Sequence, residues 1–517
     1  MTFRKAILKT NHYLDSATLM ALAQKAKGLD GVSEAVAVMA TPANKELLAN
    51  VGLLDGVADA SSARDLILAV EASSREALNS ALEALEKGLK GEKRPAGPGR
   101  ERLPRTIHEA LDLHPNLNLA LISVPGQYAT REARKALESG MHVMLFSDNV
   151  SLEHEIELKQ LAARKGLLMM GPDCGTAFIS GAPLAFANVV RQGSIGVVAA
   201  AGTGLQEIAC LVDRWYGGIS QGLGTGGRDL KEAVGGLQFI QSFRALLEDE
   251  GTRVIILTGK PPAPSVEKKI LSMVAGAEKP VIVNLLGGNR EAVRLAGGIF
   301  AGSLEEAARL AVERVGVAAG LTGFSQDLVD EAVQGVLPGQ KWLRGLYTGG
   351  TLCYEALLAL DGHLGDVYSN TPIRKELALR DSRLSFGHTV LDLGDDEFTR
   401  GRPHPMIEPS IRGERVLVEA TDPEVAVLLL DFVLGYGAHR QPVEAISVQL
   451  NKAMALAADR GGKLVIVASV TGTAADPQGL DDQVERLRKL GVYVLPSNYQ
   501  AVAFAKAIIQ QLGRAEG

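Results

Sequence analysis

The chain has 517 residues, too many for one hydrophobic core and enough for three or four domains. Hydrophobic residues make up 46% of it, charged residues 22% and aromatic residues 4%, and 57 glycines are spread along its length, a profile typical of parallel α/β layers with tight turns. The net charge of −6 and the lack of a basic stripe interleaved with aromatics argue against a nucleic-acid partner and favour a small-molecule substrate.

Cysteine spacing and apolar runs bear on the compartment. Cys174, Cys210 and Cys353 lie far apart without a CxxC pair, so we expect buried thiols rather than disulfides, and no metal site. The first residues lack an apolar signal core, and no apolar run approaches the roughly 18 residues that cross a bilayer. We therefore expect a cytoplasmic protein without a membrane segment.

The first 105 residues predict a small domain followed by a linker. Residues 1–90 alternate strand-like segments with amphipathic helices, which resembles a ferredoxin-like βαββαβ unit. Residues 91–105, GEKRPAGPGRERLPR, concentrate proline, glycine and charge without an apolar period, as linkers do.

Residues 106–190 predict a partial Rossmann-like domain, because strands and helices alternate with short connections. Ligands of such parallel sheets bind at the carboxyl ends of the strands. The candidate loops there are VPGQ, with Pro125 and Gly126, and GPDC, with Gly171, Pro172 and Asp173.

The remainder of the chain contains the same order of predicted strands, turns and helices twice. Five segments of residues 191–320 have counterparts in the same order within residues 341–517, and a helical joint at 321–340 separates the two copies. Five ordered matches make an accidental pairing a poor explanation. We infer an internal duplication that lets one chain form a pseudo-dimer.

A strand, a Gly/Thr turn and a glutamate-bearing helix recur in both copies, as VVAAAGTGLQEIACL (197–211) and LRGLYTGGTLCYEALLAL (343–360). A helix start offers unpaired N–H groups and partial positive charge, and glycine lets an anion approach closely. If the copies pack about a pseudo-twofold axis, both helix starts face one phosphate-sized site. A purely structural turn is the open alternative. The candidate phosphate-binding residues are Gly202, Thr203, Gly204, Gly349, Gly350 and Thr351.

The segment GLGTGGRDLKE (222–232) is a second candidate, in which a flexible run precedes a guanidinium suited to bidentate binding of carboxylate or phosphate. Its counterpart, GDDEFTRGRPHPMIEP (394–409), holds a histidine that could shuttle protons. Structural capping and packing are the alternatives. The predicted substrate-loop residues are Gly224, Thr225, Gly226, Gly227 and Arg402, and the predicted catalytic residues are Arg228, Asp229 and His404.

Residues 106–315 resemble the α-subunit of succinyl-CoA synthetase and other NDP-forming acyl-CoA synthetases, through VPGQYATREARKALESG, GPDCGTAFI, GSIGVVAAAGTGLQE and GIFAGSLEEAARLA. Over its whole length, with GTGGRDLKEAVGG, GRPHPMIEP and DFVLGYGAH, the chain resembles the FdrA family. The resemblance implies a CoA-binding-type domain at 106–190 and two flavodoxin-like, succinyl-CoA-synthetase-type domains. It also implies that both helix starts point at one phosphoryl group.

The chain departs from the synthetases at the position of their phosphohistidine. That residue would fall near Leu295–Gly297, yet no histidine occurs between His154 and His363. The glutamate that orients it would fall at Lys260. The glycine fingerprint of the CoA domain and a nucleotide-binding domain are also missing.

FdrA proteins are linked to oxamate carbamoyltransferase in allantoin and purine breakdown, in which carbamoyl phosphate and oxamate exchange with oxalurate and phosphate. The resemblance thus implies an acyl- or carbamoyl-phosphate-dependent transferase component that requires no cofactor. A subunit of an acyl-CoA synthetase, with CoA as candidate cofactor, and a non-catalytic scaffold or sensor are the alternatives. Companion subunits or a homo-oligomer are expected by analogy.

Overall fold

The computed structural model describes residues 2–10, 12, 16–41, 44–45, 48–49, 52–54, 62, 65–89, 103–320, 323–399 and 403–515. The chain divides into two compact units. The first comprises Met1–Leu103 with Thr399–Pro403, and the second comprises Pro104–Phe398 with His404–Gly517.

The first unit is a small α+β layer with an antiparallel three-stranded sheet in the order β1-β3-β2. Its elements are β1 (Phe3–Lys9), α1 (Ser16–Lys27), β2 (Val32–Met39), β3 (Leu66–Ala72) and α3 (Arg75–Leu89). Helix α3 buries Leu78, Ala81, Leu82 and Leu85, which recur at helical spacing on one face. This strand order is that of a ferredoxin-like unit. The last strand of the predicted βαββαβ pattern is not among the described residues, and most of the predicted linker, 91–102, lies outside them.

The second unit begins with a parallel three-stranded sheet in the order β4-β5-β6. Its elements are α4 (Ile107–Leu113), β4 (Leu119–Ile122), α5 (Gly126–Glu138), β5 (His142–Leu145), α6 (Leu152–Lys165) and β6 (Met169–Met170). Helix α5 packs its alanines Ala129, Ala133 and Ala136 into the core of this layer.

The first copy of the duplicated domain has a seven-stranded sheet in the order β13-β12-β11-β9-β10-β7-β8. Its strands are β7 (Thr176–Ile179), β8 (Ala182–Ala185), β9 (Gln192–Ala199), β10 (Ile219–Gly224), β11 (Val254–Gly259), β12 (Val281–Leu285) and β13 (Ile299–Phe300). Its helices are α7 (Gly202–Arg214), α8 (Leu237–Glu248), α9 (Pro264–Ala275), α10 (Arg290–Leu295) and α11 (Leu304–Arg314). The β7–β8 hairpin precedes residue 191, yet it pairs antiparallel with β10 and extends this sheet.

The second copy has a parallel six-stranded sheet in the order β15-β16-β14-β17-β18-β19. Its strands are β14 (Trp342–Tyr347), β15 (Val367–Tyr368), β16 (His388–Asp392), β17 (Val425–Val433), β18 (Val465–Thr471) and β19 (Tyr493–Leu495). Its helices are α13 (Gly350–Leu360), the 3-10 helix η1 (Lys375–Leu377), α14 (Asp396–Thr399), α15 (Ser410–Thr421), α16 (Glu444–Asp459), α17 (Leu480–Lys489) and α18 (Asn498–Ala515); α12 (Gln326–Val333) joins the copies.

The two sheets confirm the predicted duplication of an α/β domain. Strands β9 to β13 occupy the same relative positions in their sheet as β14, β16, β17, β18 and β19 in theirs. Each copy thus has five parallel strands in the same order, with at least one helix between successive strands. This arrangement matches the five paired segments of the sequence.

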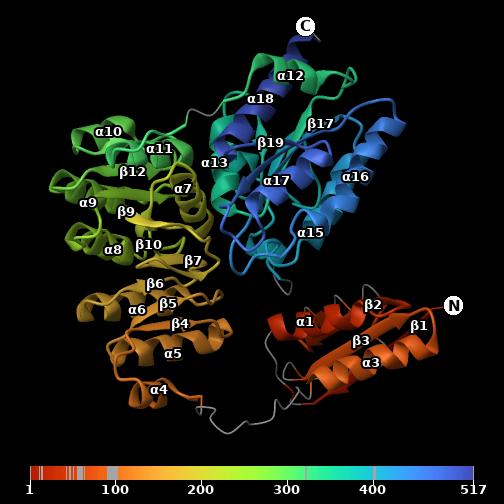
Figure 1. The fold of residues 1–517 in the computed structure, drawn as a ribbon, viewed down its shortest axis with the longest axis horizontal. Helices are drawn as coiled ribbons and strands as arrows, with labels where there is room; N and C mark the ends of the chain where they lie inside the picture. The colour runs from red at the N-terminus through yellow and green to blue at the C-terminus, as the bar shows by residue number, and fades with distance from the viewer. Residues whose placement is uncertain are drawn as a thin grey trace. The chain divides into compact units, whose positions relative to one another are not determined.

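One hydrophobic core joins the two copies. It takes buried residues from α7 and α11 of the first copy and from α13 and α18 of the second, among them Ile208, Ala308, Ala356 and Phe504. Figure 1 shows α7, in yellow, beside α13, in green. The apolar faces of these helices exclude water between the copies, which holds the two helix starts in a fixed relation.

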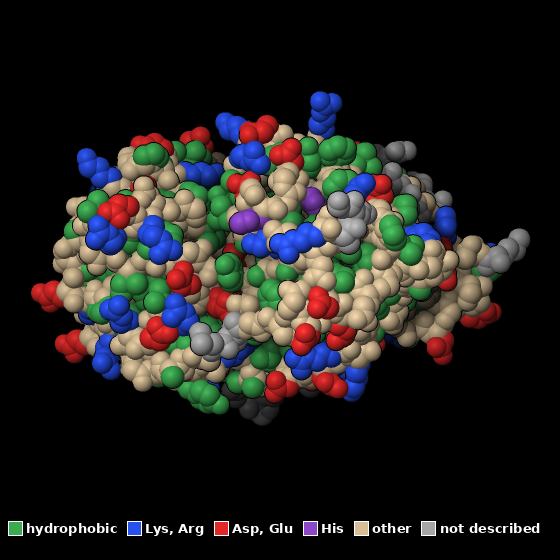
Figure 2. Space-filling model, turned by 90° about the horizontal axis from the view of Figure 1, so that it is seen from above, with side chains coloured by type: hydrophobic (Ala, Val, Ile, Leu, Met, Phe, Trp, Pro, Cys, Tyr) green, Lys and Arg blue, Asp and Glu red, His purple; other side chains and the backbone are tan. Residues whose placement is uncertain are grey.

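Charges on the surface are mixed in sign. In the face drawn in Figure 2, lysine and arginine side chains are interspersed with aspartate and glutamate. Among the described residues, no helix combines the length and apolarity that crossing a membrane requires.

Candidate anion site at two helix starts

The first turns of α7 and α13 touch one another. The Thr351 N–H group donates a hydrogen bond of 3.3 Å to Thr203 Oγ1. A Cβ atom on Gly204 would lie 2.9 Å from Thr351 Cγ2, and one on Gly349 would lie 3.0 Å from Thr203 Cγ2. The absence of side chains at the two glycines therefore permits the approach of the helices.

Backbone N–H groups and a threonine hydroxyl at the edges of these two helix turns remain available to bind an anion. Within the described structure, the N–H groups of Gly202, Thr203 and Gly204 have no acceptor. Gly202 and Gly350 are half-buried, so solvent reaches both helix starts. Thr351 Oγ1 is buried and has no hydrogen-bond partner among the described residues. The two helix starts thus contact one another, while a shared phosphate site at this contact stays a prediction.

The two helix starts differ in how they are capped. Asp431, at 0% exposure in β17, accepts hydrogen bonds from the N–H groups of Thr348, 2.7 Å, and Gly349, 2.8 Å. Arg412 of α15 neutralises this carboxylate at 3.3 Å. The equivalent position of β11, by strand register, is Thr258, which is uncharged. The start of α13 is therefore fixed by a buried ion pair, whereas the start of α7 lacks a carboxylate cap.

A second carboxylate, Asp392, ends β16 beside the same turn. Its Oδ1 accepts the Gly394 N–H at 3.0 Å, and a Cβ atom on Gly350 would lie 2.5 Å from its Oδ2. Burial raises the pKa of Asp392 to about 7, Lys260 opposes this, and Asp395 and Asp431 add to it. Asp392 therefore titrates near neutral pH.

Lys260 follows β11 directly and comes from the opposite copy. Its Nζ lies 5.4 Å from the centre of the Tyr354 ring on α13, and its charge acts on Asp392. The sequence placed Lys260 where a synthetase has a glutamate. The structure places this cation beside Tyr354 of α13 and within electrostatic range of Asp392.

Sequence reasoning missed Asp392. It ends the apolar strand HTVLD and is followed by the more conspicuous charges of GDDEF, so its own role was not visible. The signal that would have found it is register, because Asp392 is paired with Tyr347, three residues before α13 begins.

The predicted catalytic residues Arg228 and Asp229 belong to an ion cluster around Lys159. Lys159 Nζ, fully buried in α6, lies 2.8 Å from Glu155 Oε1 and 2.8 Å from Asp229 Oδ1. Arg228 Nε lies 2.7 Å from Glu155 Oε2, and its Nη2 donates to the Val150 carbonyl at 2.8 Å. Asp229 Oδ2 accepts the Phe239 N–H at 2.7 Å, which caps α8.

This geometry assigns Asp229 a structural task, because it is at 0% exposure and both its oxygens are engaged. Arg228, at 37% side-chain exposure, keeps one face toward solvent. Its paired state leaves little free charge for a substrate. The catalytic roles of both residues stay predictions.

The glycine run before Arg228 makes close backbone contacts. A Cβ atom would lie 2.5 Å from the Thr176 carbonyl at Gly224, and 2.4 Å from the Pro172 carbonyl at Gly226, where φ is +85°. Gly227 is exposed, and Thr225 is buried with its hydroxyl unpartnered among the described residues. Gly224 and Gly226 therefore serve packing, while Gly227 faces solvent.

The predicted proton shuttle His404 is half-buried near Asp392. Its Nδ1 accepts the Met406 N–H at 3.2 Å, and its Nε2 would lie 2.6 Å from a Cβ atom on Gly394. Burial lowers the pKa of His404 to about 4, so the ring is neutral at physiological pH. Arg402, the other residue predicted from this loop, lies outside the described residues.

The loops at Pro125–Gly126 and Gly171–Asp173 both contact residues 147–149, which follow β5 at the carboxyl edge of the three-stranded sheet. A Cβ atom on Gly126 would lie 2.3 Å from the Asp148 carbonyl, and the Asp173 N–H donates to the Ser147 carbonyl at 3.1 Å. Asp173 is exposed to solvent. The carboxylates of Asp148 and Asp396 act on it, and Arg228 opposes them.

The charges at these two loops fit CoA poorly. The carboxylates of Asp148 and Asp396 act on Asp173, while Arg228, the opposing charge, is held by Glu155. A diphosphate placed there would face repulsion without a free cation from this set.

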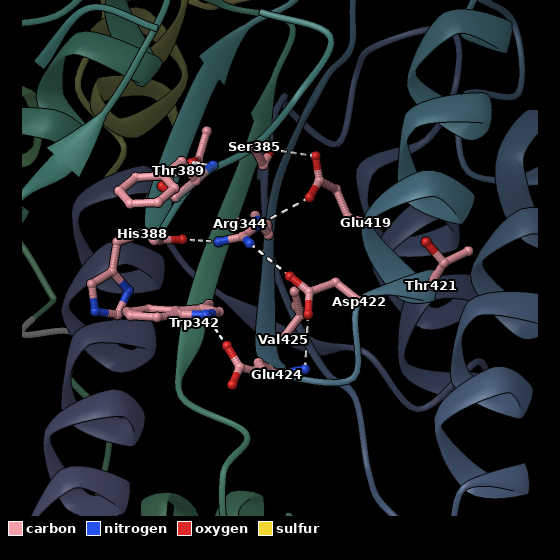
Figure 3. A network of polar contacts seen from close by, with 12 residues as sticks. Trp342, Arg344, Ser385, His388, Thr389, Glu419, Thr421, Asp422, Glu424 and Val425 are labelled. Atoms are coloured by element: carbon pink, nitrogen blue, oxygen red, sulfur yellow. Dashed lines mark hydrogen bonds and ion pairs between the residues drawn. The ribbon is translucent and has the colours of Figure 1, made fainter.

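A cavity of about 460 Å³ lies at the other end of the second sheet, near the amino ends of β14 and β16. Figure 3 shows Arg344 between Glu419, at 2.9 Å, and Asp422, at 3.0 Å, with Trp342 and His388 alongside. Arg344 has its partners within the protein, and burial lowers the pKa of His388 to about 4. This network stabilises the sheet and lies apart from the helix starts.

The three cysteines are free and buried. Burial raises the pKa of Cys174 to about 12 and holds those of Cys210 and Cys353 well above the ordinary thiol value. Their thiolates are scarce at neutral pH, as expected for packing residues.

Family models match both ends of the chain. A CoA-ligase model covers residues 346–508, and a model described as "AllF, heavy metal-associated domain" covers residues 1–104. Residues 1–104 contain no cysteine, so they lack the thiolates that soft metals prefer, and the described residues hold no group of three metal-ligating side chains. The fold and this match thus define an α/β protein that contains a CoA-ligase-type domain at residues 346–508.

A relative of nearly equal length specifies the family. YahF of Escherichia coli (strain K12), described as uncharacterized, is 44% identical over 508 residues, 98% of each chain. The chain therefore belongs to the FdrA-like family that includes YahF.

Shorter stretches match subunits of ADP-forming CoA ligases. The α-subunit 1 of succinate–CoA ligase from Archaeoglobus fulgidus is 26% identical over 35% of this chain and 62% of that protein. The ADP-forming sulfoacetate-CoA ligase subunit SqwL of an Acholeplasma species is 22% identical over 34% of this chain and 60% of that protein. A solved acetyl-coenzyme A synthetase 1 from Ca. Korarchaeum cryptofilum matches at 16% identity and TM-score 0.31 over 81% of this chain and 88% of that one.

Proposed function

We propose that the chain is the anion-binding component of a carbamoyl- or acyl-phosphate-dependent transferase, with oxalurate and phosphate exchanging for oxamate and carbamoyl phosphate. The observation that carries the proposal is the contact between Thr203 and Thr351, which brings two helix starts of opposite copies to one place. Lys260 adds a cation beside α13, within electrostatic range of Asp392.

The chemistry of this transfer matches what the helix starts offer. A departing phosphate needs N–H donors and positive charge, and both are stabilising at a helix N-terminus. The reaction needs no phosphohistidine, in keeping with the lack of histidine between His154 and His363. Lys260, in place of the orienting glutamate, favours an anion over an imidazole.

The direct test is phosphorolysis of oxalurate by the purified full chain, alone and with the products of its neighbouring genes. Carbamoyl phosphate and oxamate are measured. We expect turnover in at least one combination, and its absence in every combination would contradict the proposal.

Two variants connect that activity to the helix starts. Thr351→Val keeps the packing methyl group and removes the unpartnered hydroxyl, and its control Thr421→Val changes a threonine at the exposed end of α15. Loss of a contact to a charged phosphate costs roughly 1.5–3 kcal/mol, about tenfold or more in rate. The control should keep the activity of the unmodified chain.

A subunit of an acyl-CoA synthetase is the second candidate, favoured by the CoA-ligase model over residues 346–508. Calorimetry with CoA and a search for thioester after incubation with ATP and companion subunits distinguish it from the first. CoA binding with thioester formation would favour this candidate. A scaffold or sensor, the third reading, would keep the activity of the complex within a few-fold in the Thr351→Val variant.

A further inference from the structure

We propose that Asp392 is the residue that exchanges a proton with the substrate nitrogen at the α13 helix start. The inference rests on the proposed transferase function and assigns the general acid and base that the transfer requires. Its geometric basis is that the Asp392 carboxylate lies beside the start of α13 in its own copy, and that the Lys260 ammonium group of the other copy acts on it.

Asp392 combines burial with an uncommitted oxygen. The side chain is 6% exposed, and its Oδ1 accepts the Gly394 N–H. Among the described residues no group donates to its Oδ2, which faces Gly350 so closely that a Cβ atom there would lie at 2.5 Å. Oδ2 is not completely enclosed by protein atoms, so a ligand or a proton can reach it.

Charged and titratable groups surround Asp392 from several elements. Lys260 comes from the end of β11, Asp431 from β17, and Asp395 from the loop of Asp392 itself. Cys353 on α13 lies within electrostatic range of Asp392. Burial raises the pKa of Asp392 to about 7, Lys260 opposes this rise, and the two carboxylates add to it, so the group can both take and return a proton near neutral pH.

Two nearby groups are uncharged at neutral pH. Burial holds the pKa of the Cys353 thiol far above its usual value. His404, whose Nε2 lies close to Gly394, has its pKa lowered to about 4 by burial and is a weak base. Asp431 is committed to Thr348, Gly349 and Arg412. Asp392 is thus the better placed group.

The proposed step balances as follows for oxamate and carbamoyl phosphate. The amide nitrogen of oxamate forms a bond to the carbamoyl carbon, the carbon–oxygen bond to phosphate breaks, and phosphate leaves with that electron pair. The proton lost by the nitrogen passes to the Asp392 carboxylate. In phosphorolysis, the protonated Asp392 returns that proton to the departing nitrogen while phosphate oxygen attacks the carbonyl.

The test compares Asp392→Asn with Asp396→Asn, which removes the same charge from an exposed side chain at the start of α14. For Asp392→Asn we expect kcat to fall about 100-fold or more and the pH limb near 7 to disappear. The Asp396→Asn variant should keep both the kcat and the pH limb of the unmodified chain. Asp392→Glu retains a titrating carboxyl, so it should keep a pH limb even at reduced kcat.

Binding of inorganic phosphate gives a readout that does not depend on turnover. An ionised Asp392 repels phosphate, so at pH 8 the Asp392→Asn variant should bind phosphate more tightly than Asp396→Asn, by about threefold or more. Calorimetry on the full chain measures both affinities.

The outcomes separate the inference from the proposed function. Turnover that survives in Asp392→Asn within threefold would overturn the role of Asp392 and leave the transferase standing. Equal phosphate affinities of the two variants would also overturn it. Altered phosphate affinity without carbamoyl transfer by any form would place Asp392 at the anion site and remove the transferase.

Discussion

Glu207 on α7 and Glu355 on α13 occupy the same position of the two copies, and each caps the last helix of the other copy. Glu207 Oε1 accepts the Asn498 N–H at the start of α18, 3.0 Å, and Glu355 Oε1 accepts the Leu304 N–H at the start of α11, 2.7 Å. This exchange explains why both repeated helices carry a glutamate. It holds the helix starts together across the pseudo-twofold relation.

Removing either glutamate should destabilise the joint between the copies. Glu355→Ala leaves the buried Leu304 N–H without an acceptor, which costs about 1–3 kcal/mol. Glu207→Ala should cost a similar amount. Chemical denaturation of the full chain measures both, and Glu291→Ala on the exposed end of α10 is the control with no expected change.

The two glutamate variants should not be additive. Asn498 bonds to both side chains, through its N–H to Glu207 and through its Nδ2 to Glu355 at 2.8 Å. Residues that share a partner couple by about 0.5 kcal/mol or more. Strict additivity in the double variant would show that the two caps act independently.

Stability should fall as pH rises from 6.5 to 8. Burial raises the pKa of Glu355 and of Asp392 to about 7, so the folded chain holds protons that the unfolded chain has released, and this stabilisation is lost as pH rises through 7. His388 and His404, with pKa values near 4, act in the opposite sense, because the unfolded chain binds protons there up to about pH 7. Their contribution partly offsets the fall in stability at the lower end of the window and is nearly complete by pH 8.

Thermal unfolding at pH 6.5, 7 and 8 tests this dependence. Glu355→Gln should flatten the profile, because it removes one of the two titrating groups, and Glu291→Gln should leave it unchanged. A Tm that rises with pH across this window would contradict the assignment.

Crowding at the helix starts predicts sensitivity to side-chain size. Gly204→Val places a branched side chain against Thr351 Cγ2, which a Cβ atom alone would approach to 2.9 Å, and should destabilise by about 1–3 kcal/mol. Gly513→Val in α18 meets no atom within 4 Å and is the matched helical control. Comparable Tm values for the two variants would speak against the tight contact.

The buried ion cluster should depend on its lysine. Lys159→Met leaves Glu155 and Asp229 without the shared ammonium group, and breaking a buried ion network costs about 3–5 kcal/mol. Lys135→Met, at a partly exposed pair with Glu132, should cost far less. Denaturant titration of both variants checks the difference, and equal midpoints would show that the cluster adds no stability.

Local pattern was enough to predict the strands, the helices and the duplication. Apolar runs such as VVAAA and LRGLY are followed by glycine turns, and this order fixes a strand and a helix start wherever the chain folds as parallel α/β. Long-range pairing was not predictable in the same way. The β7–β8 hairpin joins the sheet after it in sequence, and Lys159 meets Asp229 seventy positions away.

By itself the sequence determined that two matching helix starts exist and that each bears a glutamate, because glycine turns and helical periodicity are properties of neighbouring residues. Tertiary structure alone decided that Thr203 touches Thr351, that the glutamates cap each other's copies, and that Asp392 with Lys260 faces the α13 start. The physical reason is that burial and electrostatic contact depend on which segments share a core, and such contacts between distant segments leave no period in the chain.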